Sequence, residues 1–323
     1  MAQFTIYKST DASAPVLNGT SGALVAVINA CLVDGYGSKS PAGWTKTTGA
    51  SKAAYQQGAG SVGHYMRVQD DGPGGASYCE ARITGYESMS DVDTGTNPYP
   101  TAAQGAGGVA MFVARKSVSA DSTPRPWIIA ADSRTFYLWM QTGDTGWNPA
   151  GTYTAFFFGE FFSVKPTTDS FRNLIIGRYL ENSNNLTHTG EFTDGISASI
   201  TSALSGHVIA RSYSGGGASI VATKGGDNFK GGGVTYLLGV TQYPNGTDNS
   251  LYMSPVWIAE SAAGTVRGTM RGFWHICHAI AGFSDGDTFS GANELAGKAF
   301  MLIKISGNAG IYCIETSNTL DSN

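Results

Sequence analysis

The clearest combination of metal-ligand side chains in the sequence is His275, Cys277 and His278. Imidazole nitrogens and a thiolate are ligands that zinc prefers. The preceding residues 265–273 read as a strand, and on a strand His275 and Cys277 share one face while His278 points to the other. No second group of ligands follows nearby in the sequence, so we interpret this segment as the end of an aromatic-rich strand and predict no metal site.

Two short acidic motifs, Asp91-Val92-Asp93 and Asp285-Gly286-Asp287, have the spacing at which calcium loops begin. The EF-hand pattern fails after the first of them. Gly95 stands where an oxygen ligand is needed, and Ala102 stands where a bidentate glutamate is needed. Isolated motifs of this kind usually form turns in which the carboxylate caps backbone N–H groups. We therefore predict two turns, with a structural cation as the less favoured alternative.

Catalytic chemistry on a sugar would need two carboxyl groups, and Glu87, Glu160, Glu191 and Asp194 are the candidates. Their separation in space decides whether they form a glycosidase pair, and the sequence leaves this open. The glycine-rich segment 35–40 has the wrong spacing for a phosphate-binding loop, and no nucleophile elbow or zinc-protease motif occurs. We predict a chain that is not an enzyme, with no catalytic, cofactor-binding or metal-binding residues.

Aromatic residues allow a different kind of site, because aromatic faces stack on the apolar faces of sugar rings. The candidates for such a platform are Trp127, Trp139, Trp147, Trp257 and Trp274. On alternating strands, however, most large aromatic side chains lie in the core. We expect these tryptophans to serve mainly in packing, and a glycan-binding platform stays the alternative.

The composition limits the class of protein further. Of 323 residues 44 are glycine, and only 14% are charged, against about 25% in average proteins. The net charge of −4 and the 11% of aromatic residues exclude intrinsic disorder, and give no basic surface for nucleic acid. The four cysteines are scattered, so we expect small buried thiols rather than a disulfide framework.

One helix is expected, at about residues 21–33. Leu24, Val27, Ile28, Cys31 and Leu32 recur at helical spacing and form one apolar stripe. Thr20 or Ser21 is the expected N-cap, and Asp34-Gly35 the expected end.

Almost all other ordered segments read as short strands between turn residues. The expected strands are Phe4–Tyr7, His64–Val68, Tyr78–Tyr86, Val109–Ala114, Trp127–Ala131, Thr135–Gln141, Tyr153–Phe158, Leu174–Tyr179, His207–Tyr213, Ser219–Thr223, Thr235–Gln242, Val256–Glu260, Thr265–Phe273, Ala299–Ile305 and Gly310–Glu315. Many short antiparallel strands with one short N-terminal helix predict an all-β fold, either a β-sandwich or a barrel-like arrangement.

The domain organisation has two readings. In one, residues 1–100 form a β-rich module with the helix, residues 101–108 form a linker, and residues 101–323 form a larger β-sandwich region with a glycine-rich loop at 214–233. In the other, the chain is one integrated domain with an internal pseudo-repeat. The repeat would relate Tyr65-Met66 and Gly85-Tyr86 to Tyr252-Met253 and Gly272-Phe273, each pair being twenty positions apart.

Taken together, several turn and packing motifs carry a resemblance. They are Tyr7–Leu17, Gly35–Gly37, Gly43–Lys46, Gly85–Thr96, Arg125–Trp127, Phe136–Leu138, Ser254–Trp257 and Arg271–His275. Through these segments, which are spread along nearly the whole chain, the sequence resembles a poorly characterised family of virion structural proteins of tailed bacteriophages and prophages. The resemblance implies a particle component without catalytic residues.

We therefore expect a non-enzymatic virion subunit in the tail, neck or collar, or baseplate, which assembles as a homo-oligomer. A head decoration protein and a glycan-binding host-recognition module are the alternatives. The expected partners are copies of the chain and other virion proteins, with no direct contact to nucleic acid and no membrane insertion. The N-terminus lacks the layout of a signal peptide, so we expect assembly in the bacterial cytoplasm and a final location in the virion.

Overall fold

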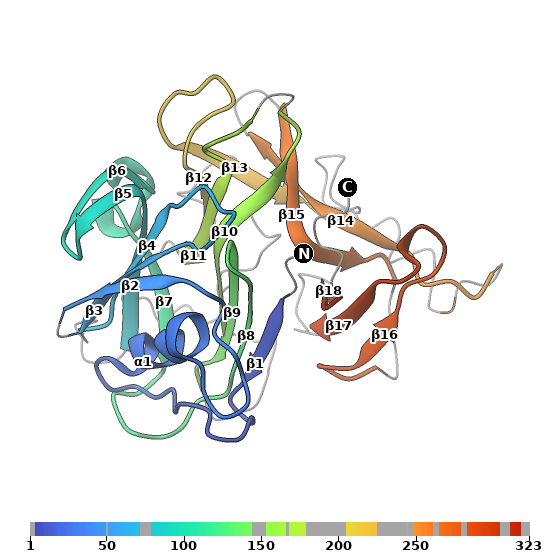
Figure 1. Ribbon diagram of the computed structural model, residues 1–323, viewed down its shortest axis with the longest axis horizontal. Coiled ribbons are helices and arrows are strands. Elements are labelled where there is room, and N and C mark those ends of the chain that lie inside the picture. Colours follow the sequence, from blue (N-terminus) through green and yellow to red (C-terminus); the bar gives the residue numbers. More distant parts are fainter. Residues whose placement is uncertain are drawn as a thin grey trace.

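The computed structural model describes residues 4–49, 51–71, 79–143, 153–165, 168–178, 205–224, 244, 248–260, 265–278, 283–303 and 311–317. These residues contain one α-helix and 18 strands (Figure 1). The predicted all-β class with one short N-terminal helix is confirmed, and the barrel-like alternative describes its centre, a closed barrel of six strands.

The barrel consists of consecutive strands of the chain. They are β10 (Tyr153–Ser163), β11 (Asn173–Arg178), β12 (Ser205–Ile209), β13 (Ser219–Lys224), β14 (Met253–Glu260) and β15 (Thr265–Ile276). Each pairs antiparallel with the next, and β15 pairs back with β10, where Phe161 lies opposite Met270 and Ser163 opposite Gly268. Closure requires Gly268, because a Cβ atom there would lie 1.8 Å from the carbonyl oxygen of Phe162.

A second group of strands precedes the barrel in the chain. It comprises β1 (Thr5–Lys8), β2 (Thr45–Thr48), β3 (Lys52–Gln56), β4 (Tyr65–Gln69), β5 (Cys79–Asp91), β6 (Thr94–Tyr99), β7 (Phe112–Ser117), β8 (Trp127–Ala131) and β9 (Thr135–Gln141). Strands β2 to β5 form a meander, β5 also pairs with β7, and β1, β8 and β9 lead into β10. The chain before residue 100 and the chain after it therefore share ladders, β5 with β7 and β1 with β8.

The predicted helix is confirmed, and its start differs from the prediction. An α-helix, α1 (Ala23–Asn29), continues into one wider turn at Ala30–Asp34 and ends at Gly35, close to the expected end. The N-cap is Gly22 rather than Thr20 or Ser21, and no side chain of its own segment caps the helix. Instead the carboxylate of Asp70, which follows β4, accepts the Leu24 N–H at 2.8 Å.

Strand β10 explains how the core is divided. Phe156 and Phe158 belong to a buried cluster with the helix and the N-terminal strands, whereas Phe157 and Phe161 belong to a second cluster that has members from all six barrel strands. Because successive side chains of a strand point to opposite faces, a strand that is buried on both faces needs a continuous apolar run. The run of phenylalanines in the sequence is the result.

A small C-terminal sheet extends from the far end of β15. It contains β18 (Ile311–Glu315), β17 (Ala299–Ile303) and β16 (Thr288–Ser290). Residues 268–270 of β15 pair with β10 in the barrel, and residues 273–276 pair with β18 in this sheet. Between them Gly272 has a φ of +59°, a left-handed conformation that glycine adopts without strain. One strand thus belongs to both units and bends at this glycine (Figure 1).

Most predicted strands have observed counterparts, with three kinds of difference. Strands β2, β3, β6 and β16 were missing from the prediction, because their Thr, Ala and Gly residues give a weak apolar pattern. Strand β7 begins at Phe112 rather than at Val109, and the predicted linker contains two short 3₁₀ turns, Ala102–Gln104 and Ala106–Gly108. The expected strand Thr235–Gln242 and the later part of the glycine-rich loop, residues 225–233, lie outside the described residues.

The pseudo-repeat is not seen in the strand register. Met66 lies opposite Gly85 in the pairing of β4 with β5. Met253 lies opposite Ile276, and not opposite Gly272, in the pairing of β14 with β15. The two segments with equal spacing in the sequence therefore belong to strand pairs, β4–β5 and β14–β15, that have different registers.

The four cysteines, Cys31, Cys79, Cys277 and Cys313, are free thiols and all are buried, as predicted. Among the described residues, no helix is long and apolar enough to cross a membrane.

Candidate binding cavity

The three potential zinc ligands near the end of β15 do not form a metal centre with other ligands. His275, Cys277 and His278 are all buried. The ring nitrogen Nε2 of His278 accepts a hydrogen bond from the Tyr252 N–H at 2.9 Å, and the two rings stack at 5.7 Å. Within the described part of the chain, no group of three His, Cys, Asp or Glu side chains is close enough to hold a metal ion.

Both acidic motifs form turns, as predicted. Val92 and Asp93 connect β5 to β6, and the Asp91 carboxylate accepts the Val92 N–H at 2.7 Å. Asp93 pairs with Arg67 at 2.6 Å and with Lys52 at 3.1 Å. In the second motif the Asp287 carboxylate accepts the Ser284 N–H at 2.8 Å. The carboxylates therefore serve the local backbone and neighbouring cations.

The two candidate glycosidase carboxylates that the structure describes, Glu87 and Glu160, have different cationic partners. Glu87 forms a two-pronged pair with Arg211, with distances of 2.6 and 2.8 Å. Glu160 is 1% exposed and lines a cavity, where it pairs with Arg172 at 2.9 Å. Glu191 and Asp194 lie outside the described residues.

The tryptophans divide into two groups. Trp127 and Trp139 are each 1% exposed and belong to the core, as expected for packing residues. Trp257 and Trp274 are half-buried and line the same cavity as Glu160. Trp147 lies outside the described residues. Two of the five candidate platform residues therefore meet in one place.

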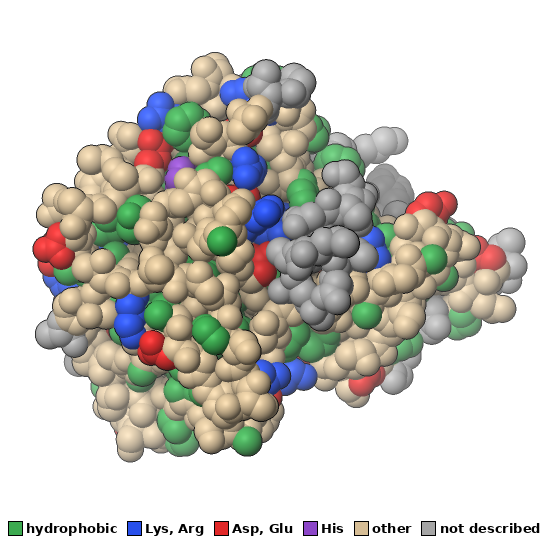
Figure 2. All heavy atoms as spheres, in the orientation of Figure 1, with side chains coloured by type: hydrophobic (Ala, Val, Ile, Leu, Met, Phe, Trp, Pro, Cys, Tyr) green, Lys and Arg blue, Asp and Glu red, His purple; other side chains and the backbone are tan. Residues whose placement is uncertain are grey.

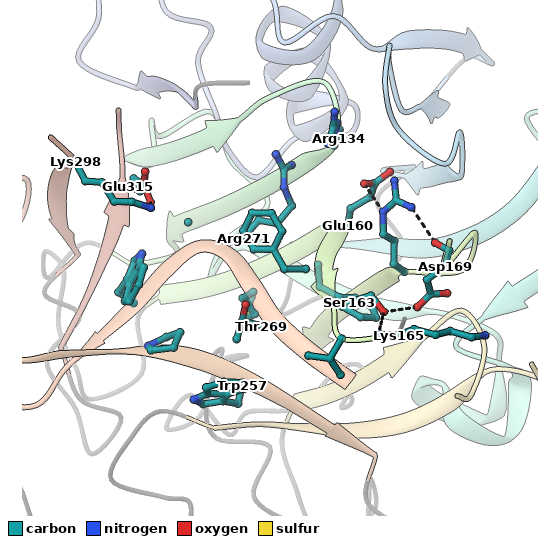
Figure 3. A pocket seen from close by; sticks show the side chains of 18 residues that line it. Arg134, Glu160, Ser163, Lys165, Asp169, Trp257, Thr269, Arg271, Lys298 and Glu315 are labelled. Carbon is teal, nitrogen blue, oxygen red and sulfur yellow. Dashed lines mark hydrogen bonds and ion pairs between the residues drawn. The ribbon is translucent and has the colours of Figure 1, made fainter. Parts of the chain in front are cut away.

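The cavity has a volume of about 710 Å³ and lies where the barrel meets the C-terminal sheet. Figure 3 shows Glu160, Ser163, Lys165 and Asp169 on one side, Lys298 and Glu315 on the other, and Thr269 and Arg271 between them. The first side comes from β10 and the segment after it, the second from the C-terminal sheet, and the middle from β15.

An irregularity in the pairing of β14 with β15 shapes this cavity. Trp257 lies opposite Thr269, whereas Pro255, two residues earlier, lies opposite Trp274. Residues 270–273 of β15 therefore lie opposite Val256 alone, and the extra residues bend the strand, as β-bulges do. The bend brings Trp257 and Trp274 to the lining of one cavity although β15 separates Thr269 from Trp274 by five positions.

Charged side chains around the cavity are held in place by one another. Arg172 donates from Nε to Glu160 and from Nη1 to the Asp169 carbonyl oxygen at 3.0 Å. Lys298 pairs with Glu315 at 3.2 Å and lies 5.9 Å from the ring centre of Trp274. These contacts fix Arg172 beside Glu160 and Lys298 beside the ring of Trp274.

Arg271 is held from behind the cavity wall. Its Nη1 pairs with Asp132 Oδ2 at 2.9 Å, and its guanidinium lies 5.6 Å from the ring centre of Phe162. Only 1% of the surface of the Arg271 side chain is exposed, so its position is fixed by packing as well as by charge.

Asp169 in the cavity lining is a poor candidate for a general acid. Burial acts to raise the pKa of Asp169, but the hydrogen bond from Ser163 at 2.7 Å and the charge of Arg267 hold that pKa below its usual value. A general acid at neutral pH needs a raised pKa. Ionised Asp169 is therefore better suited to accepting hydrogen bonds than to protonating a leaving group.

Sequence reasoning missed most of the polar lining residues. Arg271 lies inside one of the packing motifs named above, and Lys298 was not among the candidate residues. No local signal could have joined Lys165, Arg271 and Lys298, since their proximity depends on barrel closure and on the bend in β15. The only local indication was the presence of Trp257 and Trp274 among the candidate platform residues.

Comparison of the chain with protein-family models gave no match, and comparison with curated proteins gave none either.

Proposed function

We propose that the chain is a non-enzymatic structural subunit of a tailed bacteriophage virion, located in the tail, neck or collar, or baseplate, and assembled as a homo-oligomer. The proposal rests on the resemblance of its turn and packing motifs to virion proteins. The structural observation that best supports it is the distribution of charge between the interior and the surface.

Many of the few charged residues are buried. The chain has 20 basic and 24 acidic residues. Among the described residues the buried ones are Asp70, Glu80, Arg115, Lys116, Arg125, Asp132, Glu160, Asp169, Arg178, Arg267, Arg271 and Glu315. Several form internal ion pairs, such as Arg271 with Asp132 and Arg267 with Asp169. Because these residues are buried, the surface holds fewer charged side chains than the sequence contains.

The remaining surface is largely uncharged. Figure 2 shows charged side chains scattered singly or in small groups over a face that consists mostly of uncharged polar side chains and backbone. The buried centres of protein interfaces are depleted in charged residues, because removing a charge from water is unfavourable. A surface of this kind suits close packing between copies in a symmetric assembly.

Assembly can be tested on the purified full-length chain and on particles. We expect sedimentation velocity to show a defined homo-oligomer over a range of protein concentrations. We also expect mass spectrometry of purified virions to find the chain at a fixed copy number. A chain that stays monomeric at all concentrations and is absent from virions would contradict the proposal.

The same particles distinguish the possible locations. Gold-labelled antibody against the chain should mark the tail, neck or baseplate in electron micrographs. Label over the whole capsid would instead support the alternative of a head decoration protein. In both cases the proposed site of assembly is the cytoplasm of the bacterial host, and the proposed partners are copies of the chain and other virion proteins.

Host-glycan recognition is a second candidate function, because Trp257 and Trp274 line one cavity together with fixed cationic side chains. It is compatible with the first, since a structural subunit can also carry a binding site.

A further inference from the structure

The aromatic residues of the cavity differ from those of the core in their accessibility. Trp257 and Trp274 are half-buried, and Phe162 is half-buried beside them, whereas Trp127 and Trp139 are fully packed. A partly open aromatic face combines a large apolar area with a fixed orientation, which suits stacking against the C–H face of a sugar ring. The lining therefore offers a surface on which a pyranose ring can stack.

The polar part of the cavity has an excess of positive charge. Five basic residues line it, namely Arg134, Lys165, Arg172, Arg271 and Lys298, against the three acids Glu160, Asp169 and Glu315. The chain as a whole carries a net charge of −4, so the cavity is locally basic within an acidic protein. Cationic side chains are the usual partners of carboxylate and phosphate groups.

The three acids of the lining already have cationic partners. Glu160 pairs with Arg172, Glu315 with Lys298, and Asp169 with Arg267. These pairs, like that of Arg271 with Asp132, balance a cation as well as a carboxylate, so the positive charge that an anionic ligand meets comes chiefly from Lys165. They also orient Arg172 and Lys298, so less side-chain entropy is lost when a ligand binds.

The rim of the cavity adds a cation and an aromatic ring. Lys165 Nζ lies 5.7 Å from the ring centre of Tyr213, which is 40% exposed. Among the described residues Lys165 pairs with no carboxylate, and its neighbour Val164 is 53% exposed. The combination of ring and cation seen inside the cavity is therefore repeated at its edge.

We propose that this cavity binds an acidic saccharide, that is, a pyranose ring that carries a carboxylate or phosphate group. The ring stacks on Trp257 and Trp274, and the acidic group lies against the basic residues. The volume of about 710 Å³ is within the usual range of small-molecule sites, about 300–1,000 Å³. This inference rests on the second candidate function, glycan recognition, for which it names the class of sugar, and it does not depend on the role of a virion subunit.

The first test uses sugars that differ only in their acidic group. Glucose, glucuronate and glucose 6-phosphate share one ring, and the galactose and mannose series provide the same three forms. We expect NMR titration of the full-length chain to show that at least one series binds its acidic forms about tenfold more tightly than the neutral sugar. A preference for uronate over sugar phosphate, or the reverse, identifies the acidic group that is recognised.

Inorganic phosphate tests whether the ring contributes. We expect phosphate alone to bind about tenfold more weakly than the best sugar phosphate or uronate. Equal binding of phosphate and the acidic sugar would overturn the proposal, because a simple anion site would then explain the result. Equal binding of neutral and acidic sugars, or no binding in any series at millimolar concentration, would overturn it as well.

Two substitutions separate stacking from charge. Trp257→Ala should weaken binding of the acidic sugar about tenfold, and Lys165→Gln should weaken it less and reduce its dependence on salt. The matched controls are Tyr252→Ala, an aromatic residue that is 51% exposed away from the lining, and Lys46→Gln, which pairs with Asp34 on another surface. Equal losses in the variants and their controls would contradict the assignment of the site. Virions that incorporate the Trp257→Ala chain normally but fail to bind sugar would separate this inference from the structural function.

Discussion

Lys116 of β7 and Asp70, which follows β4, form an ion pair in which both side chains are fully buried. The second carboxylate oxygen of Asp70 accepts the Leu24 N–H at 2.8 Å, so the pair also caps helix α1. Lys116 additionally donates to the carbonyl oxygen of Thr20, just before the helix. A single buried pair thereby connects the helix to two strands of the sheet that it covers.

Replacement of Lys116 should be strongly destabilising. Lys116→Met leaves the Asp70 carboxylate buried without its cation, and we expect the free energy of unfolding to fall by about 3–5 kcal/mol in chemical denaturation. The matched control is Lys46→Met, because Lys46 pairs with Asp34 at the surface and its loss should change stability by less than about 1 kcal/mol. Similar losses in both variants would show that the buried pair has no special role.

The apolar stripe of the helix provides a second prediction. Ile28 is 0% exposed within the helix-side core, so Ile28→Asp places an unpaired charge there and should destabilise the fold by more than about 3 kcal/mol. Ala26, on the exposed side of the same helix, is the control, and Ala26→Asp should change stability by about 1 kcal/mol or less. Thermal melts of the two variants compare them directly, and a loss below about 1 kcal/mol for Ile28→Asp would show that the helix is peripheral.

The bend in β15 predicts a specific effect at Gly272. An alanine at its φ of +59° is strained, and we expect Gly272→Ala to destabilise the chain by about 1–2 kcal/mol. The substitution should also weaken the binding of any ligand that spans the cavity, since Gly272 lines the cavity. Gly217→Ala is the control, because that glycine has no atoms near the position of an added Cβ and no left-handed backbone. Equal stability of the two variants would argue against strain at the bend.

His64 should make stability depend on pH. Burial lowers the pKa of His64 to about 4, and its ring Nδ1 lies 3.0 Å from the Tyr99 hydroxyl. The unfolded chain binds a proton at this histidine near pH 6.5, and the folded chain only near pH 4. The stability conferred by neutral His64 is therefore complete above pH 6.5 and is lost as the pH falls towards 4.

This loss can be isolated with His64→Gln, which cannot titrate. Across that interval the unmodified chain should lose about 3 kcal/mol more stability than the variant, because one pKa unit corresponds to about 1.4 kcal/mol. Acids that do not interact with His64 titrate in both proteins and cancel in the comparison, whereas Glu87 interacts with the charge of His64 and contributes to the measured difference. Parallel curves of stability against pH would show that His64 is not the responsible group.

Local patterns predicted the elements of this fold better than their assembly. The stripe from Leu24 to Leu32 was sufficient for the helix, and β-branched and aromatic runs were sufficient for most strands. The true helix cap was not predictable, since Asp70 is 46 positions away from the Leu24 N–H that it accepts. Barrel closure likewise depends on the distant pairing of Phe161 with Met270.

The candidate site shows the same limit more sharply. The sequence marked five tryptophans as equal candidates, and only the fold separates Trp257 and Trp274 from those in the core. What separates them is the register of β14 and β15, in which extra residues accumulate beside Gly272. A bulge of this kind leaves no apolar periodicity in the sequence, so the cavity and its basic lining could not be predicted.

The buried thiols have a practical consequence. Burial raises the pKa of Cys31 and of Cys313 far above the usual thiol value, and Cys79 and Cys277 are also enclosed. Native cysteines in this state react slowly with maleimides, since the thiolate is the reactive form. A cysteine introduced at the exposed Val164 would therefore be the preferred attachment point for a fluorophore. Occupancy of the nearby cavity could then be followed by fluorescence without first removing any natural cysteine.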